Sequence, residues 1–167
     1  KKNTMTYKIY VASVSAQVAF TSDPVVSVYQ DGFKIAGEPS SATGKLYAVS
    51  SATPLELTKD NIKSATGVVS KDFRDTSLSF EFANANNGEY YVYFALANAN
   101  DEITSQVYSV KINKVEIDTA EKFMKVAGGE KLGDEVPSQT IYMLTGDIDF
   151  TGVTYKVGKA NFTGVLN

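Results

Sequence analysis

The stretch GEYYVYFALAN, residues 88–98, decides the fold of this chain. It is rich in Tyr, Val and Phe, which favour strands, and Tyr90 and Val92 lie two residues apart, so they point to the same face of a strand. After a polar turn, a second run follows with its own alternating apolar positions. These inward positions are Tyr108, Val110 and Ile112. The stretch therefore predicts two neighbouring strands of a sheet with one buried face.

Alternating segments also precede this stretch. The first covers residues 6–20 and predicts two strands or one bulged strand. The others are the two arms of VVSVYQDGFKIAG at 25–37, GKLYAVSS at 44–51 and SLSFEF at 77–82. In the second segment Asp31-Gly32 is a pair preferred where both turn residues need positive φ, which predicts a hairpin. In SLSFEF, Leu78, Phe80 and Phe82 share one face. About seven strands across residues 6–113 are typical of a β-sandwich.

The pattern of Gly88, Tyr90 and Val92 resembles the F strand of immunoglobulin-like and fibronectin type III-like domains. In those domains a tyrosine corner lies two residues before an inward core position. Val92 stands where antibody domains carry Cys, and the chain has no Trp, so the resemblance implies a disulfide-free member. The alternative is an ordinary tyrosine-rich strand with one buried face.

The character of the sequence changes after Asn113. In VEIDTAEKFMKVAGG, Asp118 as N-cap with Glu121 three residues later predicts a capping box and a short helix that ends at Gly128. The helical spacing is carried by Phe123, Met124 and Ala127. The strand TIYMLTGDIDF is expected next, and the phrase FTGV occurs at 150–153 and again at 162–165. We expect an immunoglobulin-like β-sandwich at 1–114 and a capping helix with an incomplete β-repeat at 115–167.

This order of elements resembles the opening of GLUG-type β-helical repeat segments in bacterial cell-surface proteins. The matching positions are Ile117, Thr119, Ala120, Phe123, Tyr142, Leu144, Asp147, Ile148, Asp149, Phe162, Gly164 and Leu166. The resemblance implies that the helix caps a stack, that a small β segment forms its first coil, and that further coils follow. It implies no catalytic residue. An uncovered final strand would also permit edge-strand self-association through the C-terminal repeat.

The composition excludes several classes of partner and of catalytic site. The net charge of -3, with scattered lysines, gives no basic stripe for nucleic acid. No apolar run approaches the roughly 20 residues of a membrane span, so we expect no membrane insertion within this segment. With no Cys, His or Trp, thiol nucleophiles, Ser-His-Asp triads and Cys- or His-ligated zinc sites are excluded. We therefore expect a chain that is not an enzyme.

Two sets of residues are candidate sites. Asp147 and Asp149 would share one face of a strand, where paired carboxylates bind Ca²⁺ or, less readily, hydrolyse glycosides, although a solvated strand face is the simpler interpretation. Tyr91 and Tyr93, with Tyr47, would form an aromatic platform for a ligand, with burial in a core as the alternative. We expect no cofactor other than this candidate calcium.

The polar loops at 84–88 and 98–102 are expected to lie at one end of the sandwich, as binding loops do, or to be ordinary turns. Together these features predict a non-enzymatic binding or spacer module, extracellular or on the bacterial cell surface, with a glycan or protein ligand. Two alternatives remain: an accessory region of a secreted protease or polysaccharide-degrading enzyme, and a pilus-type structural subunit.

Overall fold

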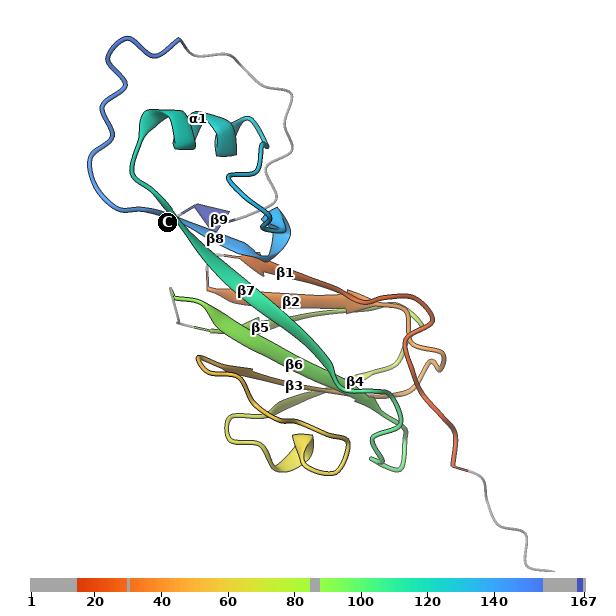
Figure 1. Cartoon of the computed structure of the whole chain (residues 1–167). Helices are drawn as coiled ribbons and strands as arrows, with labels where there is room; N and C mark the ends of the chain where they lie inside the picture. Colours follow the sequence, from red (N-terminus) through yellow and green to blue (C-terminus); the bar gives the residue numbers. More distant parts are fainter. Residues whose placement is uncertain (1–14, 30, 85–87, 155–164, 167) are drawn as a thin grey trace, which may run out of the picture.

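The computed structural model describes residues 15–29, 31–84, 88–154 and 165–166. They form two sheets, with strand order β1-β2-β5 in one and β4-β3-β6-β7-β8-β9 in the other (Figure 1). The strands are β1 Val25–Tyr29, β2 Gly32–Gly37, β3 Gly44–Ser51, β4 Val69–Phe73, β5 Leu78–Ala83, β6 Tyr90–Ala97, β7 Tyr108–Ile117, β8 Thr140–Leu144 and β9 Val165–Leu166. The prediction of an all-β protein is confirmed.

The three-stranded sheet contains the predicted hairpin, but its glycine has a different role from the expected one. β1 and β2 pair antiparallel, with Tyr29 opposite Gly32, so Gly32 is the first residue of a strand and not part of the turn. Its φ is not in the left-handed region, and neither is that of Asp31. A Cβ at Gly32 would lie 2.0 Å from the carbonyl oxygen of Phe82 on β5. Glycine is therefore required here because two strands approach closely.

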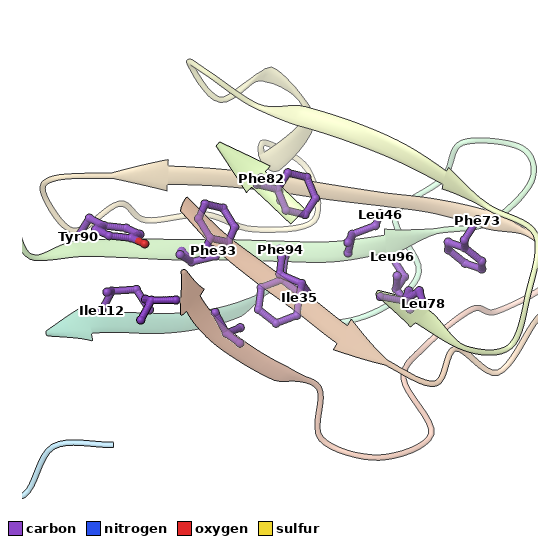
Figure 2. Packing of buried hydrophobic residues seen from close by; sticks show 14 of the residues in the cluster. Phe33, Ile35, Leu46, Phe73, Leu78, Phe82, Tyr90, Phe94, Leu96 and Ile112 are labelled. Atoms are coloured by element: carbon purple, nitrogen blue, oxygen red, sulfur yellow. The ribbon is translucent and has the colours of Figure 1, made fainter. Parts of the chain in front are cut away.

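The core lies between the two sheets and is built from alternate residues of each (Figure 2). From the first sheet come Val26, Val28, Phe33, Ile35, Leu78 and Phe82, and from the second Leu46, Ala48, Phe73, Tyr90, Val92, Phe94, Leu96 and Ile112. Phe33 stacks on Phe82 with ring centroids 5.3 Å apart. Burying one such side chain stabilises the fold by about 1.5–3 kcal/mol. The inward faces predicted for SLSFEF and for residues 90–92 are confirmed.

Phe80 is only partly buried, and it lies on β5, which forms one open side of the three-stranded sheet. Lys71 of β4 crosses this side, and its Nζ donates to the carbonyl oxygen of Glu81 on β5 at 2.6 Å. The same ammonium lies 5.7 Å from the ring centroid of Phe80 and 5.0 Å from that of Phe82. A charged side chain across two sheet edges hinders pairing with another chain.

β7 passes from one kind of ladder into another without a break (Figure 1). Its residues 108–112 pair antiparallel with β6, and Asn113–Ile117 pair parallel with β8. β8 in turn pairs parallel with β9. The expected boundary after residue 114 therefore falls inside a continuous strand. Ile141 of β8 also belongs to the main core, and the short 3-10 turn η2, Pro137–Gln139, contacts β1.

The predicted helix is present as α1, Ala120–Ala127, but it begins one residue later than expected. Thr119 is the N-cap, and its Oγ1 accepts from the backbone N–H of Lys122 at 3.2 Å. Asp118 instead forms an ion pair with Lys122 at 2.7 Å. The helix ends at Gly128, as predicted. Within the described residues no helix is long and apolar enough to cross a membrane.

A second, smaller apolar cluster lies beneath α1. It consists of Ile117, Val126 and Tyr142, with Val115, Phe123, Leu132 and Ile148 packed against it. Val126 and Ala120 are the buried residues of the helix, and Phe123 packs against the cluster, whereas Ala127 of the predicted helical spacing is exposed.

The strand expected over residues 140–150 is shorter than predicted, because β8 ends at Leu144. The first FTGV phrase forms a turn in which Gly152 has φ +76° and the N–H of Val153 donates to Phe150. The second phrase lies mostly outside the described residues, as does the first part of the expected strand at 6–20.

Candidate functional site

The turn between β6 and β7 is organised by a buried asparagine. Asn98 is 3% exposed, and its Oδ1 accepts from the N–H groups of Asn100 at 2.9 Å and Glu102 at 3.1 Å. Its Nδ2 donates to the carbonyl oxygen of Ala16 at 3.1 Å and to Glu102 Oε2 at 3.0 Å. Because nearly every polar atom of Asn98 is bonded, the turn is held in one conformation.

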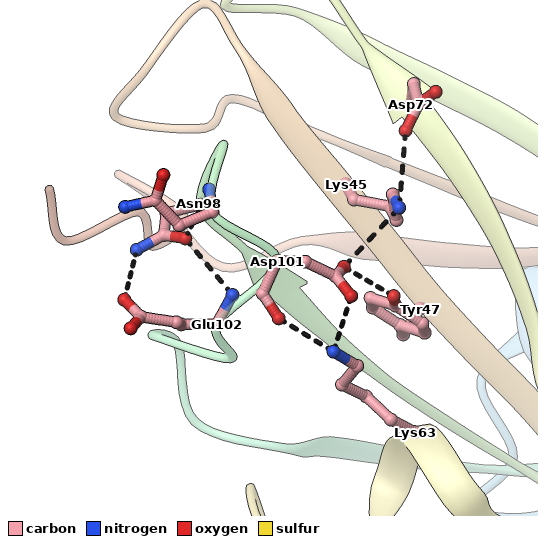
Figure 3. A network of polar contacts seen from close by, with 8 residues as sticks. Lys45, Tyr47, Lys63, Asp72, Asn98, Asp101 and Glu102 are labelled. Atoms are coloured by element: carbon pink, nitrogen blue, oxygen red, sulfur yellow. Dashed lines mark hydrogen bonds and ion pairs between the residues drawn. The ribbon is translucent and has the colours of Figure 1, made fainter. Parts of the chain in front are cut away.

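Asp101 lies at the tip of this turn with φ +64° and is the centre of a charged network (Figure 3). Its Oδ1 accepts from Tyr47 Oη at 2.5 Å and lies 3.4 Å from Lys45 Nζ, while its Oδ2 pairs with Lys63 Nζ at 2.5 Å. Lys45 also lies 3.9 Å from Asp72 across the β3–β4 ladder.

The hydrogen bonds from Lys63 and then from Tyr47 lower the pKa of Asp101 to about 2. Burial, followed by the hydrogen bond to Asp101, raises the pKa of Tyr47 to about 12. At neutral pH the pair is therefore a carboxylate and a neutral phenol. Neither group has the near-neutral pKa that a general acid or base requires.

An open cleft of about 440 Å³ lies beside this network. It is bounded by the start of β3, the end of β4 and the β6–β7 turn. The lining residues are Thr43, Gly44, Lys45, Asp72, Phe73, Arg74, Asn98, Ala99 and Asp101. The size lies within the range of small-molecule sites, and the lining is richer in charge than most such sites.

The tyrosines expected to form a ligand platform share one outer face of the sheet, as predicted, but that face is largely covered. Tyr93 is 6% exposed and Tyr47 8%, and Tyr93 Oη accepts from the backbone N–H of Leu55 at 2.8 Å. The segment at 52–68, with buried Ile62 in the 3-10 turn η1 (Ile62–Ser64), packs over β3. Tyr93 therefore fastens a covering loop and does not fit a ligand-stacking role, whereas the role of the half-buried Tyr91 stays a prediction.

The two aspartates expected as calcium ligands lie beyond the end of β8, not on a strand. Both are exposed, and only Ile148 between them packs inward. Asp149 Oδ1 accepts from the N–H of Thr151 at 2.8 Å, which lowers the pKa of Asp149. In the described ranges, no three acidic, His or Cys side chains gather closely enough to hold a metal ion.

The loops at 84–88 and 98–102 were interpreted either as binding loops at one end or as ordinary turns, and the described residues do not fit the first interpretation. β6 lies between them, so Asn84 and Gly88 precede it while the Asn98–Glu102 turn follows it. A strand of this length separates its ends by more than about 20 Å. The cleft was not predicted, because Lys45, Asp72 and Arg74 look like ordinary strand-end charges until the sheet brings them together.

Comparisons with known proteins add little to this geometry. No family model matches the chain, and no curated protein matches it. A solved structure, that of wild-type OgpA from Akkermansia muciniphila, is similar with a TM-score of 0.40 and 15% sequence identity, over 61% of this chain and 30% of that one. The chain thus spans about a third of that protein, and the likeness is too low to support an argument about function.

Proposed function

We propose that this chain is a rigid, non-enzymatic module of a bacterial cell-surface or secreted protein, which fixes the spacing of neighbouring parts and presents a binding cleft. The observation that carries the proposal is β7, a ten-residue strand shared by the antiparallel sheet and the parallel ladder. A flexible joint would need a linker at this position, and the backbone here is hydrogen-bonded on both halves.

Three connections support rigidity at this junction. The parallel ladder joins Asn113–Ile117 to β8 over five residue pairs. Ile141 of β8 lies in the main core at 6% exposure, and η2 contacts β1 of the other sheet. Bending the junction would break backbone hydrogen bonds, each of which contributes about 1 kcal/mol, and would also expose Ile141.

The fold can be specified further within this proposal. The order β1-β2-β5 facing β4-β3-β6-β7 fits strands A-B-E and C′-C-F-G of an immunoglobulin-like or fibronectin III-like sandwich. The parallel pairing of β7, β8 and β9 with α1 nearby supports the expected first coil of a GLUG-type β-helical segment. This resemblance supports an extracellular location, and protease treatment of intact cells would test it.

The chemistry of the cleft favours binding over catalysis. The carboxylates of Asp72 and Asp101 both face Lys45, and Asp101 is further held by Lys63 and Tyr47. A carboxylate fixed in this way stabilises the position of a loop. It has little capacity to exchange a proton with a substrate near neutral pH.

The decisive experiment measures the distance between the two ends of the junction. Because the chain has no Cys, the double variant Ser70→Cys/Ala127→Cys places spin labels only on exposed positions of β4 and α1. Double electron–electron resonance should give one narrow distance distribution. The pair Ser70→Cys/Ser79→Cys, with both labels beside the main core, provides the width of a rigid reference.

A distribution for the first pair that is several times broader than the reference, or that has two maxima, would refute the spacer function. Binding is a separate part of the proposal. A glycan and matrix-protein array probed with the full chain, without any signal, would leave only the spacer role.

A further inference from the structure

Arg74 is the single arginine of the chain, and it lies at the wall of the cleft just after β4. Its side chain is exposed, and within the described residues it forms no hydrogen bond or ion pair. The guanidinium group presents a planar set of donors that matches a carboxylate in a bidentate arrangement. An unpaired guanidinium beside a cleft is therefore available to a ligand.

The charged side chains that line the cleft are Lys45, Arg74, Asp72 and Asp101, so the lining as a whole is neutral. Lys45 lies near both carboxylates, and Asp101 is also held by Lys63, which lies outside the lining. Among the described residues, Arg74 is therefore the lining charge without a partner. A carboxylate on a ligand would give this guanidinium its partner.

The cleft is also preformed. The bonds of Asn98 and Asp101 fix the β6–β7 turn on one side, and β3 and β4 pair on the other. At the base, a Cβ on Gly44 would lie 2.5 Å from the carbonyl oxygen of Ala97 and 2.6 Å from Phe73 Cζ, so this position is closely packed. A rigid site loses little conformational entropy when it binds.

Hydrogen-bonding groups lie along the cleft. Phe73 is 4% exposed and offers almost no surface. The hydroxyl of Thr43 and the carboxylate of Asp72, whose side chain is 74% exposed, are available to hydroxyl groups. Such a surface fits a polyhydroxylated ligand better than the apolar side chains of a peptide.

From these observations we infer that the cleft binds an acidic sugar unit. Arg74 holds the sugar carboxylate, and Asp72 accepts hydrogen bonds from ring hydroxyls. This inference deepens the binding part of the proposed function and rests on it. The class is a uronic acid or another carboxylated sugar within a glycan.

The test is a nuclear magnetic resonance titration of the full ¹⁵N-labelled chain. The probes are glucuronic acid, galacturonic acid and N-acetylneuraminic acid, with glucose as the neutral counterpart and acetate and aspartyl-glycine as carboxylates without a sugar ring. We expect saturable shifts confined to residues 43–45, 72–74 and 98–101 with at least one acidic sugar, at millimolar Kd. Glucose, acetate and the dipeptide should bind at least about tenfold more weakly.

Variants separate the roles of the residues. Arg74→Gln should abolish the shifts, and Arg74→Lys, which keeps the charge but loses the fork, should weaken binding about tenfold. Asp72→Asn should weaken binding of the sugar but not that of acetate, because acetate has no hydroxyl group to donate to this position. Lys34→Gln, which removes an equal charge on β2 away from the cleft, is the matched control and should bind normally.

The inference is wrong if no acidic sugar shifts the cleft residues, if acetate or the dipeptide binds as well as the sugars, or if Arg74→Gln binds unchanged while its spectrum remains folded. The spin-label distances are independent of Arg74. A rigid junction in a protein whose cleft binds none of the acidic sugars would therefore refute this inference and leave the spacer function intact.

Discussion

Replacing Gly32 with alanine should destabilise the protein far more than a single methyl group suggests. Gly32 pairs with Tyr29 of β1 and with Ala83 of β5, so strands lie on both sides of it. The added Cβ would be 2.0 Å from the carbonyl oxygen of Phe82, whereas real Cβ contacts are almost never closer than 3.0 Å. β2 and β5 would have to separate locally by about 1 Å.

The expected loss follows from this separation. It would strain the ladder between β2 and β5 near the hydrogen bond from Asn84 N–H to Asp31 oxygen, 2.8 Å long in the native protein. Overpacking of this kind costs about 1–3 kcal/mol, and one weakened backbone hydrogen bond adds about 1 kcal/mol. The lower conformational entropy of the unfolded alanine chain offsets about 0.4–1 kcal/mol. We expect a net loss of about 1–3.5 kcal/mol in the free energy of unfolding.

Urea unfolding measures this loss directly. It is followed by far-ultraviolet circular dichroism, because the chain has no Trp to provide a fluorescence signal. The control is Gly146→Ala, where an added Cβ meets nothing within 4 Å and φ is not positive. That variant should be unchanged or slightly more stable. If Gly32→Ala is as stable as Gly146→Ala, β2 and β5 do not approach each other closely at Gly32 and the argument from this contact is wrong.

Three further predictions concern the core, the covering loop and the charged network. Phe82→Ala should cost about 3–5 kcal/mol in urea unfolding and Phe80→Ala clearly less, because Phe80 is only partly buried; equal losses would contradict the packing. Tyr93→Phe removes the acceptor of the Leu55 N–H and should cost about 1–2 kcal/mol, with faster hydrogen exchange at that amide; unchanged exchange would show that the bond is absent. The pKa of Asp101 is about 2 when folded and 3.8 in its ordinary range, so its contribution to stability is complete above about pH 4 and is lost as the pH falls toward 2. Because the side chain is 41% exposed, Asp101→Asn should cost no more than about 1 kcal/mol at pH 7 and should remove that part of the acid dependence; an unaltered pH profile would mean that the network is not formed in solution.

Much of the fold could be predicted from the sequence where a strand buries one face. The alternation in β5 and the aromatic run of β6 identify their inward residues, because the period of two in a strand depends only on local geometry. The helix was predicted from its capping residues and its helical spacing, which are also local features of the sequence. Its cap was misplaced by one residue, because Asp118 and Thr119 are both good N-caps and only tertiary packing selects between them.

Features that depend on distant residues could not be predicted. β4 has weak local signals, since Ser70 and Asp72 face solvent, and it forms by pairing with β3. Tyr93 is covered by a loop some 38 residues away in sequence, so its burial is not visible in the local pattern. The cleft is similar: Lys45, Asp72 and Asp101 come from three separate elements. The predicted boundary after residue 114 rests on a change in composition, and the local sequence does not show that β7 continues through this position.

The most direct test of the account is whether the two ends of β7 move as one body. Residual dipolar couplings of backbone N–H groups, measured on the weakly aligned full chain, report the orientation of each part independently. We predict that couplings from β1–β6 and couplings from α1 and β8 fit a single alignment tensor, with the orientation that the shared strand imposes. Two tensors of clearly different magnitude would show independent motion of the two parts, and would contradict the claim that β7 joins them into one rigid module.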